Sequence, residues 1–196
     1  MLTIDVNPIA AQVGPIAVSW YSLAMLAAVL CALLVAGREV QRKGLSMDEL
    51  LGLVVWALIG GLLGARLVHV VDRWAYYVSN PAQILALQNG GLAILGGIIG
   101  GGVAAGVVAR RRGIAMRRLF DAAAPAVVLG QGIGRFGCLI NGDAVGPATN
   151  GNWGIVYLHP GAMAPQLGVA FQPTFLYEQV WDFAVFAVLW SLRRRL

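Results

Sequence analysis

Five long apolar stretches dominate the hydrophobic pattern of this chain. Each has roughly 18–23 residues, and a helix needs about 20 apolar residues to cross a bilayer. Little sequence remains between them, so the pattern predicts one membrane domain over residues 1–196 with an all-α fold, a polytopic bundle of about five transmembrane helices. The predicted spans are residues 15–37, 50–71, 91–109, 119–140 and 175–192.

Composition supports a membrane protein. Hydrophobic residues make up 59% of the 196 residues and charged residues 12%, which is more apolar sequence than a soluble domain of this size can bury. The N-terminus does not resemble a cleaved signal peptide, because its first charged residue is Asp5 and its apolar run is too long.

Basic residues lie on alternate connecting segments. Segments 38–49 and 110–118 and the C-terminal tail carry nearly all the arginine and lysine, whereas the N-terminal segment and residues 141–174 carry none. Residues 72–90 carry only Arg73. Cytoplasmic loops are enriched in these side chains, so we expect the N-terminus outside and the C-terminus in the cytoplasm.

The net charge of +5 follows from this topology. The charges flank spans and do not form a basic face with interleaved aromatic residues, so we expect no nucleic-acid partner. Cys31 and Cys138 lie in different spans without a CxxC pattern. The sequence therefore predicts neither a disulfide nor a metal site.

Glycines recur four residues apart inside the spans, a spacing that lets helix backbones approach closely. This pattern predicts tight packing of the second, third and fourth helices. The pairs are Gly60–Gly64, Gly96–Gly100, Gly102–Gly106 and Gly130–Gly134.

Two arginines lie inside the predicted spans. Arg66 in the second span and Arg135 in the fourth both fall about five residues from the outer end, or roughly 8 Å below the outer boundary. An unpaired guanidinium in hydrocarbon costs at least ~2.5–3.5 kcal/mol. We therefore expect a carboxylate or a lipid phosphate beside each, and arginine suits bidentate phosphate binding.

Carboxylates are expected at the same level of the membrane. The fourth span ends in the turn Asn141-Gly142-Asp143, and Tyr177 and Glu178 begin the fifth span from the same side. Two cations and two carboxylates would then converge in the outer leaflet. The alternative is that the arginines reach the interface by snorkelling and that Glu178 only caps or pairs structurally.

Three further side chains have open roles. His69, on the helical face of Arg66, is a base, a pairing partner or an interface residue, and His159 in the outer segment has the same alternatives. Cys138 is a nucleophile or a buried structural thiol, and no histidine lies near it in sequence.

The outer segment 141–174 is rich in Gly, Pro and Asn and has one charged residue, Asp143. Connections of this length are usually functional. We expect it to fold back over the outer membrane surface as a lid or substrate platform.

The fourth span ends in a segment that resembles the signature of the bacterial phosphatidylglycerol–prolipoprotein diacylglyceryl transferase family. It reads Gly134-Arg135-Phe136-Gly137-Cys138-Leu139-Ile140-Asn141-Gly142-Asp143, and Gly146 closes the turn. Other segments resemble family motifs in the same order. They are Trp20-Tyr21, Gly64-Ala65-Arg66, Gly90-Gly91-Leu92-Ala93-Ile94 with Gly96-Gly97, and Pro173-Thr174-Phe175-Leu176-Tyr177-Glu178.

The resemblance implies a multi-pass enzyme of the bacterial plasma membrane, with its active site facing the outer leaflet. The family transfers the diacylglyceryl group of phosphatidylglycerol to the lipobox cysteine of a preprolipoprotein, forming a thioether and releasing glycerol phosphate. Its partners are phosphatidylglycerol, the lipobox peptide and the lipid bilayer, and no metal or organic cofactor is required.

The resemblance also implies residue roles. Arg135 would bind the headgroup and stabilise the departing phosphate, and Asp143 would orient the site or help take the thiol proton. The remaining candidates are Arg66, Tyr21, Asn141 and Gly142 for phosphatidylglycerol binding, with Tyr177, Glu178 and Gly146 in support.

The chain departs from the family pattern at several positions. Leu95 stands where the family usually has His or Tyr, Cys138 where it has Asn, and Gln172 where it has His. The sequence also stops at Leu196, before a further span of the family that bears Tyr-Gly-x-x-Arg. Leu95, Gln172 and the short C-terminus favour an alternative, a catalytically inactive relative that binds anionic phospholipid or lipobox peptide. The intact turn from Arg135 to Asp143 favours the enzyme.

Two other classes fit less well. A transporter or channel would place charged or broken helices near the bilayer midplane, whereas these charges lie toward one face. A glycerol-phosphate acyltransferase would need glycine-rich and histidine motifs in cytoplasmic loops, which here carry arginines and a few carboxylates.

Overall fold

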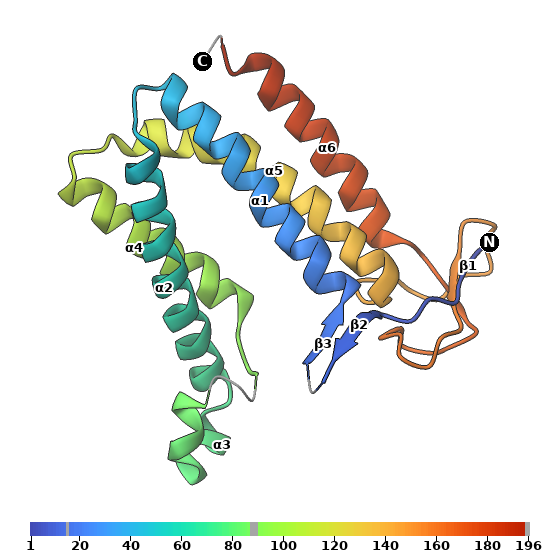
Figure 1. Ribbon diagram of the computed structural model, residues 1–196. Coiled ribbons are helices and arrows are strands. Elements are labelled where there is room, and N and C mark those ends of the chain that lie inside the picture. Colours follow the sequence, from blue (N-terminus) through green and yellow to red (C-terminus); the bar gives the residue numbers. More distant parts are fainter. Residues whose placement is uncertain (15, 87–89, 195–196) are drawn as a thin grey trace. The chain divides into compact units, whose positions relative to one another are not determined.

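The computed structural model describes residues 1–14, 16–86 and 90–194, which form two compact units (Figure 1). The first unit comprises Met1–Arg38 and Ala122–Leu196, and the second comprises Glu39–Asp121. Five helices among the described residues have the length and composition to cross a membrane. The predicted number of spans and the mostly helical fold are confirmed.

The long helices overlap all five predicted spans. The first unit holds most of α1 (Trp20–Arg42) and α5 (Met116–Asn141), and all of α6 (Thr174–Leu192). The second unit contains α2 (Met47–Asp72), α3 (Trp74–Ser79), the 3-10 helix η1 (Pro81–Leu85) and α4 (Ile94–Arg111).

The first helix begins later than predicted, because a β-hairpin precedes it. Strands β2 (Ile9–Val13) and β3 (Ile16–Ser19) pair antiparallel. Ser19 then caps α1, since its Oγ accepts a hydrogen bond from the Ser22 N–H at 3.0 Å. The helix therefore begins at Trp20, after the predicted start of the span at residue 15.

A capping box fixes the start of α2. The Ser46 Oγ accepts from the Glu49 N–H at 3.1 Å, and the Glu49 carboxylate accepts from the Ser46 N–H at 2.6 Å. Both bonds satisfy N–H groups that a helix start leaves unpaired. The helix thus begins at Met47, slightly before the predicted span.

Glycines bring α2 and α4 into backbone contact. A Cβ atom added to Gly60 would lie 2.7 Å from the Gly100 carbonyl oxygen, and one on Gly64 would lie 2.9 Å from the Gly100 Cα. Side chains do not fit at these distances, so the spacing of Gly60–Gly64 and Gly96–Gly100 marks this interface as predicted.

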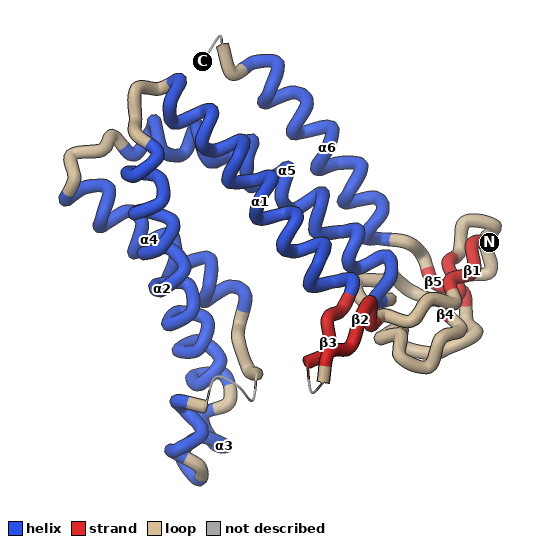
Figure 2. The backbone as a smooth tube through the Cα atoms, viewed as in Figure 1, coloured by secondary structure: helices blue, strands red, loops and turns tan. Residues whose placement is uncertain are grey.

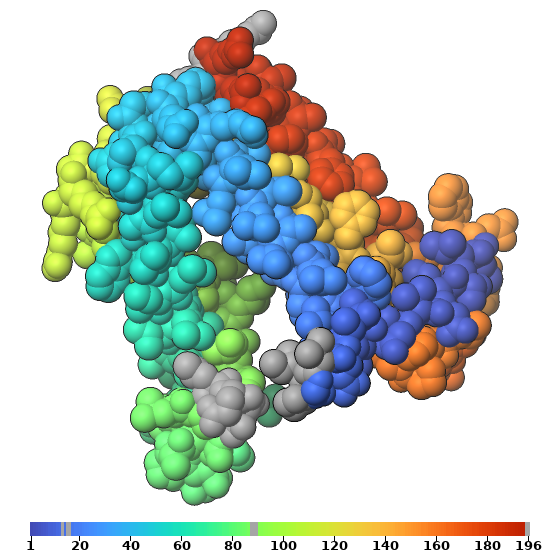
Figure 3. All heavy atoms as spheres, in the orientation of Figure 1, coloured from blue at the N-terminus to red at the C-terminus, as the bar shows by residue number. Residues whose placement is uncertain are grey.

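The glycines of α5 pack against a different helix from the one predicted. A Cβ on Gly130 would lie 3.3 Å from the Ala28 carbonyl oxygen, and one on Gly134 would lie 3.3 Å from the Met25 sulfur. Both neighbours belong to α1, and Figure 3 shows atoms of α5 between those of α1 and α6 over part of their length. A Cβ on Gly102 would have no atom within 4 Å, and one on Gly106 would lie 3.5 Å from the Met116 Cε, so the third predicted pair, Gly102–Gly106, marks no close backbone contact.

Short strands add to the helical fold at one end of the first unit (Figure 2). Strand β4 (Ile155–Tyr157) pairs in parallel with β1 (Leu2–Ile4) and antiparallel with β5 (Ala170–Phe171). The all-α prediction therefore missed two small sheets. The outer segment folds through β4 and β5 onto the N-terminus of the chain.

A small apolar core lies where this sheet meets the helix ends. Its buried members come from α5, β4 and α6, and they pack with partly buried neighbours such as Ile4 and Leu139. The core holds the end of α5, the start of α6 and the outer segment together. The buried members are Cys138, Ile155, Tyr157 and Phe175.

Candidate functional site

Arg135 lies near the C-terminal end of α5 and forms an ion pair with Glu178 near the start of α6. The arginine side chain is 23% exposed and that of Glu178 is 51% exposed. The guanidinium therefore has the carboxylate partner that its position within an apolar helix requires.

Asp182 is a second carboxylate near Arg135. It follows Glu178 by one helical turn, so both lie on the same face of α6. Asp182 is 6% exposed, and its Oδ2 has no hydrogen-bond partner among the described residues. The positive charge of Arg135 acts on this carboxyl group.

Asp182 is absent from the sequence-based candidates, although a signal was present. A carboxylate inside a membrane span is expected to be functional, and Asp182 lies within the predicted span 175–192.

Gln179 fixes α6 against α5 between these two carboxylates. Its buried Nε2 donates a hydrogen bond to the Gly132 carbonyl oxygen at 3.0 Å. A Cβ on Gly132 would lie 3.3 Å from the Asp182 Cβ, so the helix backbones meet here. The position of Asp182 relative to α5 is therefore closely constrained.

A tight turn places Asp143 beside the end of α5. Gly142 has φ of 79°, and its N–H donates to the Cys138 carbonyl oxygen at 2.9 Å, which ends the helix in a left-handed turn. Ala144 also has a positive φ of 55°, a strained conformation for a residue with a Cβ. Its carbonyl oxygen accepts from the Thr174 hydroxyl at 2.7 Å.

The predicted turn glycine Gly146 continues this arrangement. Its N–H donates to the Gln172 carbonyl oxygen at 2.8 Å, and an added Cβ would lie 2.7 Å from the Thr174 Cγ2. The turn after α5 is thus fastened to the start of α6 at two points.

The Asp143 carboxylate is poorly satisfied. Its Oδ1 is buried and has no hydrogen-bond partner among the residues described. The charges of Asp143 and Arg135 both act on the Cys138 thiol and on the Tyr21 phenol. The structure thus gathers these four groups, three of which are sequence-predicted site residues.

Tyr21 reaches this cluster because α5 has a glycine opposite it. A Cβ on Gly137 would lie 2.8 Å from the Tyr21 Cδ2 and 3.1 Å from its Cα. Only glycine allows the first turn of α1 to approach α5 this closely.

Tyr157 is a buried residue of the cluster that the sequence analysis missed. Its hydroxyl donates to the Leu139 carbonyl oxygen at 3.0 Å. Burial, followed by the negative charge of Asp143, raises the pKa of Tyr157 to about 12. A tyrosine in a polar outer segment carries no signal in sequence that it will fold against a helix end.

The remaining candidates of this unit have peripheral positions. The Asn141 carbonyl oxygen accepts from the Met163 N–H at 2.8 Å, and its Nδ2 lies 3.2 Å from the Met163 sulfur. Asn141 thus ties α5 to the outer segment. Tyr177 is 55% exposed on α6. The lipid-binding roles of both stay predictions.

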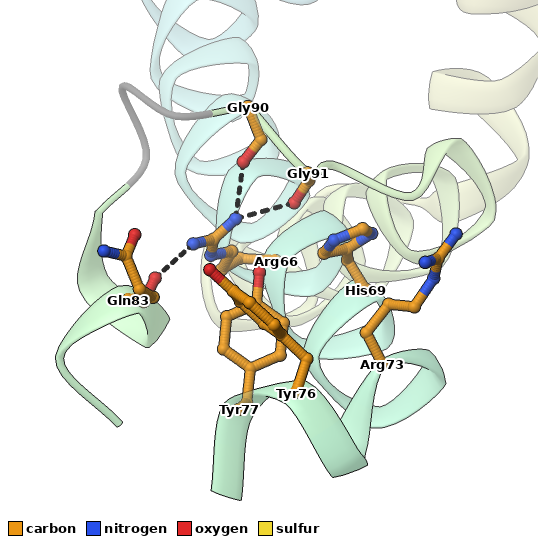
Figure 4. Close-up of a pocket in the computed structure, with 8 residues that line it drawn as sticks. All are labelled: Arg66, His69, Arg73, Tyr76, Tyr77, Gln83, Gly90 and Gly91. Carbon is orange, nitrogen blue, oxygen red and sulfur yellow. Dashed lines mark hydrogen bonds between the residues drawn. The ribbon is translucent and has the colours of Figure 1, made fainter. Parts of the chain in front are cut away.

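Arg66 in the second unit has a different environment (Figure 4). It is 7% exposed, and its guanidinium donates five hydrogen bonds, all to main-chain carbonyl oxygens. These bonds account for the five N–H groups of a guanidinium. The acceptors belong to Gln83, Ile84, Ala86, Gly90 and Gly91.

Arg66 therefore organises the chain that follows α3. Its guanidinium also lies over the Tyr77 ring, 5.4 Å from the centroid. A lipid phosphate would have to compete with the carbonyl oxygens. The predicted common depth of Arg66 and Arg135 stays a prediction, because they belong to different units.

A cavity of about 410 Å³ opens beside Arg66. Figure 4 shows His69 and Arg73 on one side and the two tyrosines on another. His69 meets the Tyr77 ring edge to face at 6.0 Å. The lining residues are Arg66, His69, Arg73, Tyr76, Tyr77, Gln83, Gly90 and Gly91.

The other two open candidates have local structural contacts. The His159 Nδ1 accepts from the Gly161 N–H at 3.0 Å, within the outer segment. Cys138 is buried in the small apolar core. Within the described part of the chain, no cluster of His, Cys, Asp or Glu side chains could hold a metal ion.

Comparison with known proteins identifies the family of this chain. Residues 8–196 match the prolipoprotein diacylglyceryl transferase family. A phosphatidylglycerol–prolipoprotein diacylglyceryl transferase of Lactiplantibacillus plantarum is 42% identical over 193 residues, covering 96% of this chain and 68% of the relative.

Similar proteins of the same name occur in other bacteria. The one from Enterococcus faecalis is 40% identical over 100% of this chain and 71% of its own length. The one from Bacillus licheniformis is 42% identical over 96% of this chain and 71% of its own length. With its five apolar helices, the chain belongs to the prolipoprotein diacylglyceryl transferases, a family of multi-pass membrane enzymes.

Proposed function

We propose that this protein transfers the diacylglyceryl group of phosphatidylglycerol to the lipobox cysteine of preprolipoproteins. The observation that carries the proposal is the cluster at the end of α5. There a cation held by an exposed carboxylate lies near a buried carboxylate oxygen that has no partner among the described residues. This cluster lies on the segment that resembles the family signature.

The reaction needs one cation and one base. The cysteine sulfur forms a bond to the glycerol carbon of the lipid, and the bond between that carbon and the phosphate oxygen breaks. The oxygen keeps the electron pair and leaves as part of glycerol phosphate, while the thiol proton passes to a base. The product is a thioether.

Arg135 stabilises the phosphate as it departs. Its planar guanidinium presents two donors to a phosphate oxygen pair. Charge develops on the leaving oxygen in the transition state, so a cation fixed there lowers the barrier. Partial burial strengthens the interaction, because water screens it less.

Asp143 receives or orients the thiol proton. Its Oδ1, which has no partner among the described residues, is available to accept a hydrogen bond, and the strained turn at Ala144 holds it in place. The nearby Cys138 is buried in the apolar core, so the attacking thiol is that of the peptide substrate. Tyr21 borders the lipid on the α1 side.

The side of the membrane on which the site lies follows from the uneven distribution of basic residues among the connecting segments. With the N-terminus outside, the turn after α5 faces the outer leaflet of the bacterial plasma membrane. Phosphatidylglycerol reaches the site from the bilayer, and the lipobox peptide reaches it from the outer surface. Arg66 acts as a positioning residue through the carbonyl oxygens that it binds.

The test is transfer of labelled phosphatidylglycerol to a lipobox peptide by the chain in liposomes. Arg135→Ala should lower kcat by roughly 10²–10³-fold through loss of the leaving-group cation. Asp143→Asn should lower it by roughly 10²–10⁴-fold through loss of the base. Asp5→Asn, a matched change at an exposed carboxylate, should leave kcat unchanged, and normal turnover by Arg135→Ala would refute the assignment.

A second candidate is a relative that binds phospholipid without turnover. Leu95, on the first turn of α4, is 61% exposed and has no group that could carry a proton. This alternative predicts that phosphatidylglycerol binds and that Arg135→Ala releases it, but that no thioether forms. Leu95→His would then be expected to introduce transfer.

A further inference from the structure

Two carboxyl groups on one face of α6 lie near a single guanidinium. Glu178 holds Arg135 in an ion pair, whereas Asp182, one turn along the helix, has an Oδ2 without a partner among the described residues. Both lie in the reach of the Arg135 charge. The site therefore has two carboxyl groups for one arginine.

The two carboxylates differ in their freedom to move. The Glu178 side chain is 51% exposed and lies near the start of α6, so it can turn toward the polar surface. Asp182 is 6% exposed and packs where α6 meets Gly132. The bond from Gln179 to the Gly132 carbonyl oxygen keeps this part of the helix in place. Only Glu178 can leave the arginine.

An incoming phosphodiester has the same charge as a carboxylate and prefers the same donor geometry. It cannot share one edge of the guanidinium with Glu178, because like charges in contact repel. If it takes the place of Glu178, the charge of the site stays the same. Asp182 then remains as the counterion of Arg135 on the buried side.

We propose that Glu178 occupies the phosphate position on Arg135 until the lipid displaces it, while Asp182 is a fixed positioning residue that retains Arg135 during the exchange. The proposal rests on the proposed function only in naming a phospholipid as the displacing anion. It predicts that the two carboxylates substitute for each other as partners of the guanidinium.

Thermal unfolding tests, without requiring turnover, whether one carboxylate can replace the other as the partner of Arg135. Four purified proteins are compared: the wild type, Glu178→Gln, Asp182→Asn and the double variant. Each single variant should lower Tm slightly, because the other carboxylate still neutralises Arg135. The double variant should lower Tm by clearly more than the sum of the single shifts, because it leaves a buried cation without a partner. Glu178→Gln combined with Asp5→Asn is the control pair and should be additive.

Lipid binding tests the displacement. Glu178→Gln should bind phosphatidylglycerol in nanodiscs about tenfold more tightly than the wild type, because no carboxylate has to be displaced. Binding of uncharged diacylglycerol should not change. Additive Tm shifts would overturn the role of Asp182, and unchanged or weaker phosphatidylglycerol binding by Glu178→Gln would overturn the role of Glu178.

Turnover separates this proposal from the proposed function. If the wild type shows no transfer but both results above are found, the exchange stands and the enzymatic assignment fails. If transfer occurs, Asp182→Asn should lower kcat without raising KM, because phosphate still binds but Arg135 is no longer held in place. Asp182→Glu should restore kcat in part.

Discussion

Single residues at this site combine burial with incomplete hydrogen bonding. Asp143 and Asp182 each keep one buried oxygen without a partner among the described residues, at a typical cost of about 1–3 kcal/mol or more for a charged group. Arg135, Asp143 and Tyr21 could be predicted from sequence, because a charge within an apolar run and a family motif mark them. Tyr157 could not, because its burial depends on how the outer segment folds back.

Tyr157→Phe should destabilise the protein at neutral pH. The substitution removes the hydrogen bond to Leu139 and leaves a carbonyl at the helix end unpaired, at a cost of about 0.5–1.5 kcal/mol. The measurement is chemical unfolding in detergent. Tyr76→Phe, at a tyrosine that is 54% exposed, is the control and should have little effect.

The same tyrosine gives a defined pH dependence. Its pKa rises from 10.0 to about 12 on folding, so the folded state holds the phenolic proton more tightly than the unfolded state. The resulting stabilisation is complete below pH 10.0 and is lost as the pH rises to about 12. The stability difference between wild type and Tyr157→Phe should therefore shrink across this interval, and a constant difference would contradict the assignment.

At the scale of elements, long periodic features could be predicted and short paired ones could not. The five spans follow from apolar length alone. Strands β1 and β4 pair across most of the chain, and strands of this length have no detectable periodicity in sequence. The start of α1 differs from the predicted start of the first span, because the short strands of the preceding hairpin are apolar enough to resemble part of a span.

Glycine spacing identified the contact between α2 and α4, which gives a direct test. Gly64→Val should destabilise the protein by about 1–3 kcal/mol or prevent folding, because the side chain would overlap the backbone at Gly100. Gly102→Ala, where nothing lies within 4 Å, should be neutral or stabilising by up to about 1 kcal/mol. Thermal unfolding in detergent measures both, and equal effects would refute the close approach.

At the scale of the whole molecule, the asymmetry of basic residues predicts which side of the membrane each segment faces. In a Cys31→Ala background, a thiol introduced by Asp5→Cys should react with an impermeant maleimide added to intact spheroplasts. A thiol introduced by Asp48→Cys, before the second span, should react only after permeabilisation. The reverse pattern would invert the topology and place the Arg135 site in the inner leaflet.

The carbonyl contacts of Arg66 have a consequence for how this family can diverge. The Arg66 guanidinium binds the main-chain oxygens of Gln83, Ile84, Ala86, Gly90 and Gly91, in the way that several oxygens coordinate a cation. Main-chain oxygens are common to all amino acids, so the bonds from Arg66 to residues 84 and 86 are largely independent of the side chains of Ile84 and Ala86. Substitutions there should be tolerated in relatives, whereas Arg66 and the closely packed Gly91, where a Cβ would lie 2.6 Å from the His69 Nε2, should resist replacement.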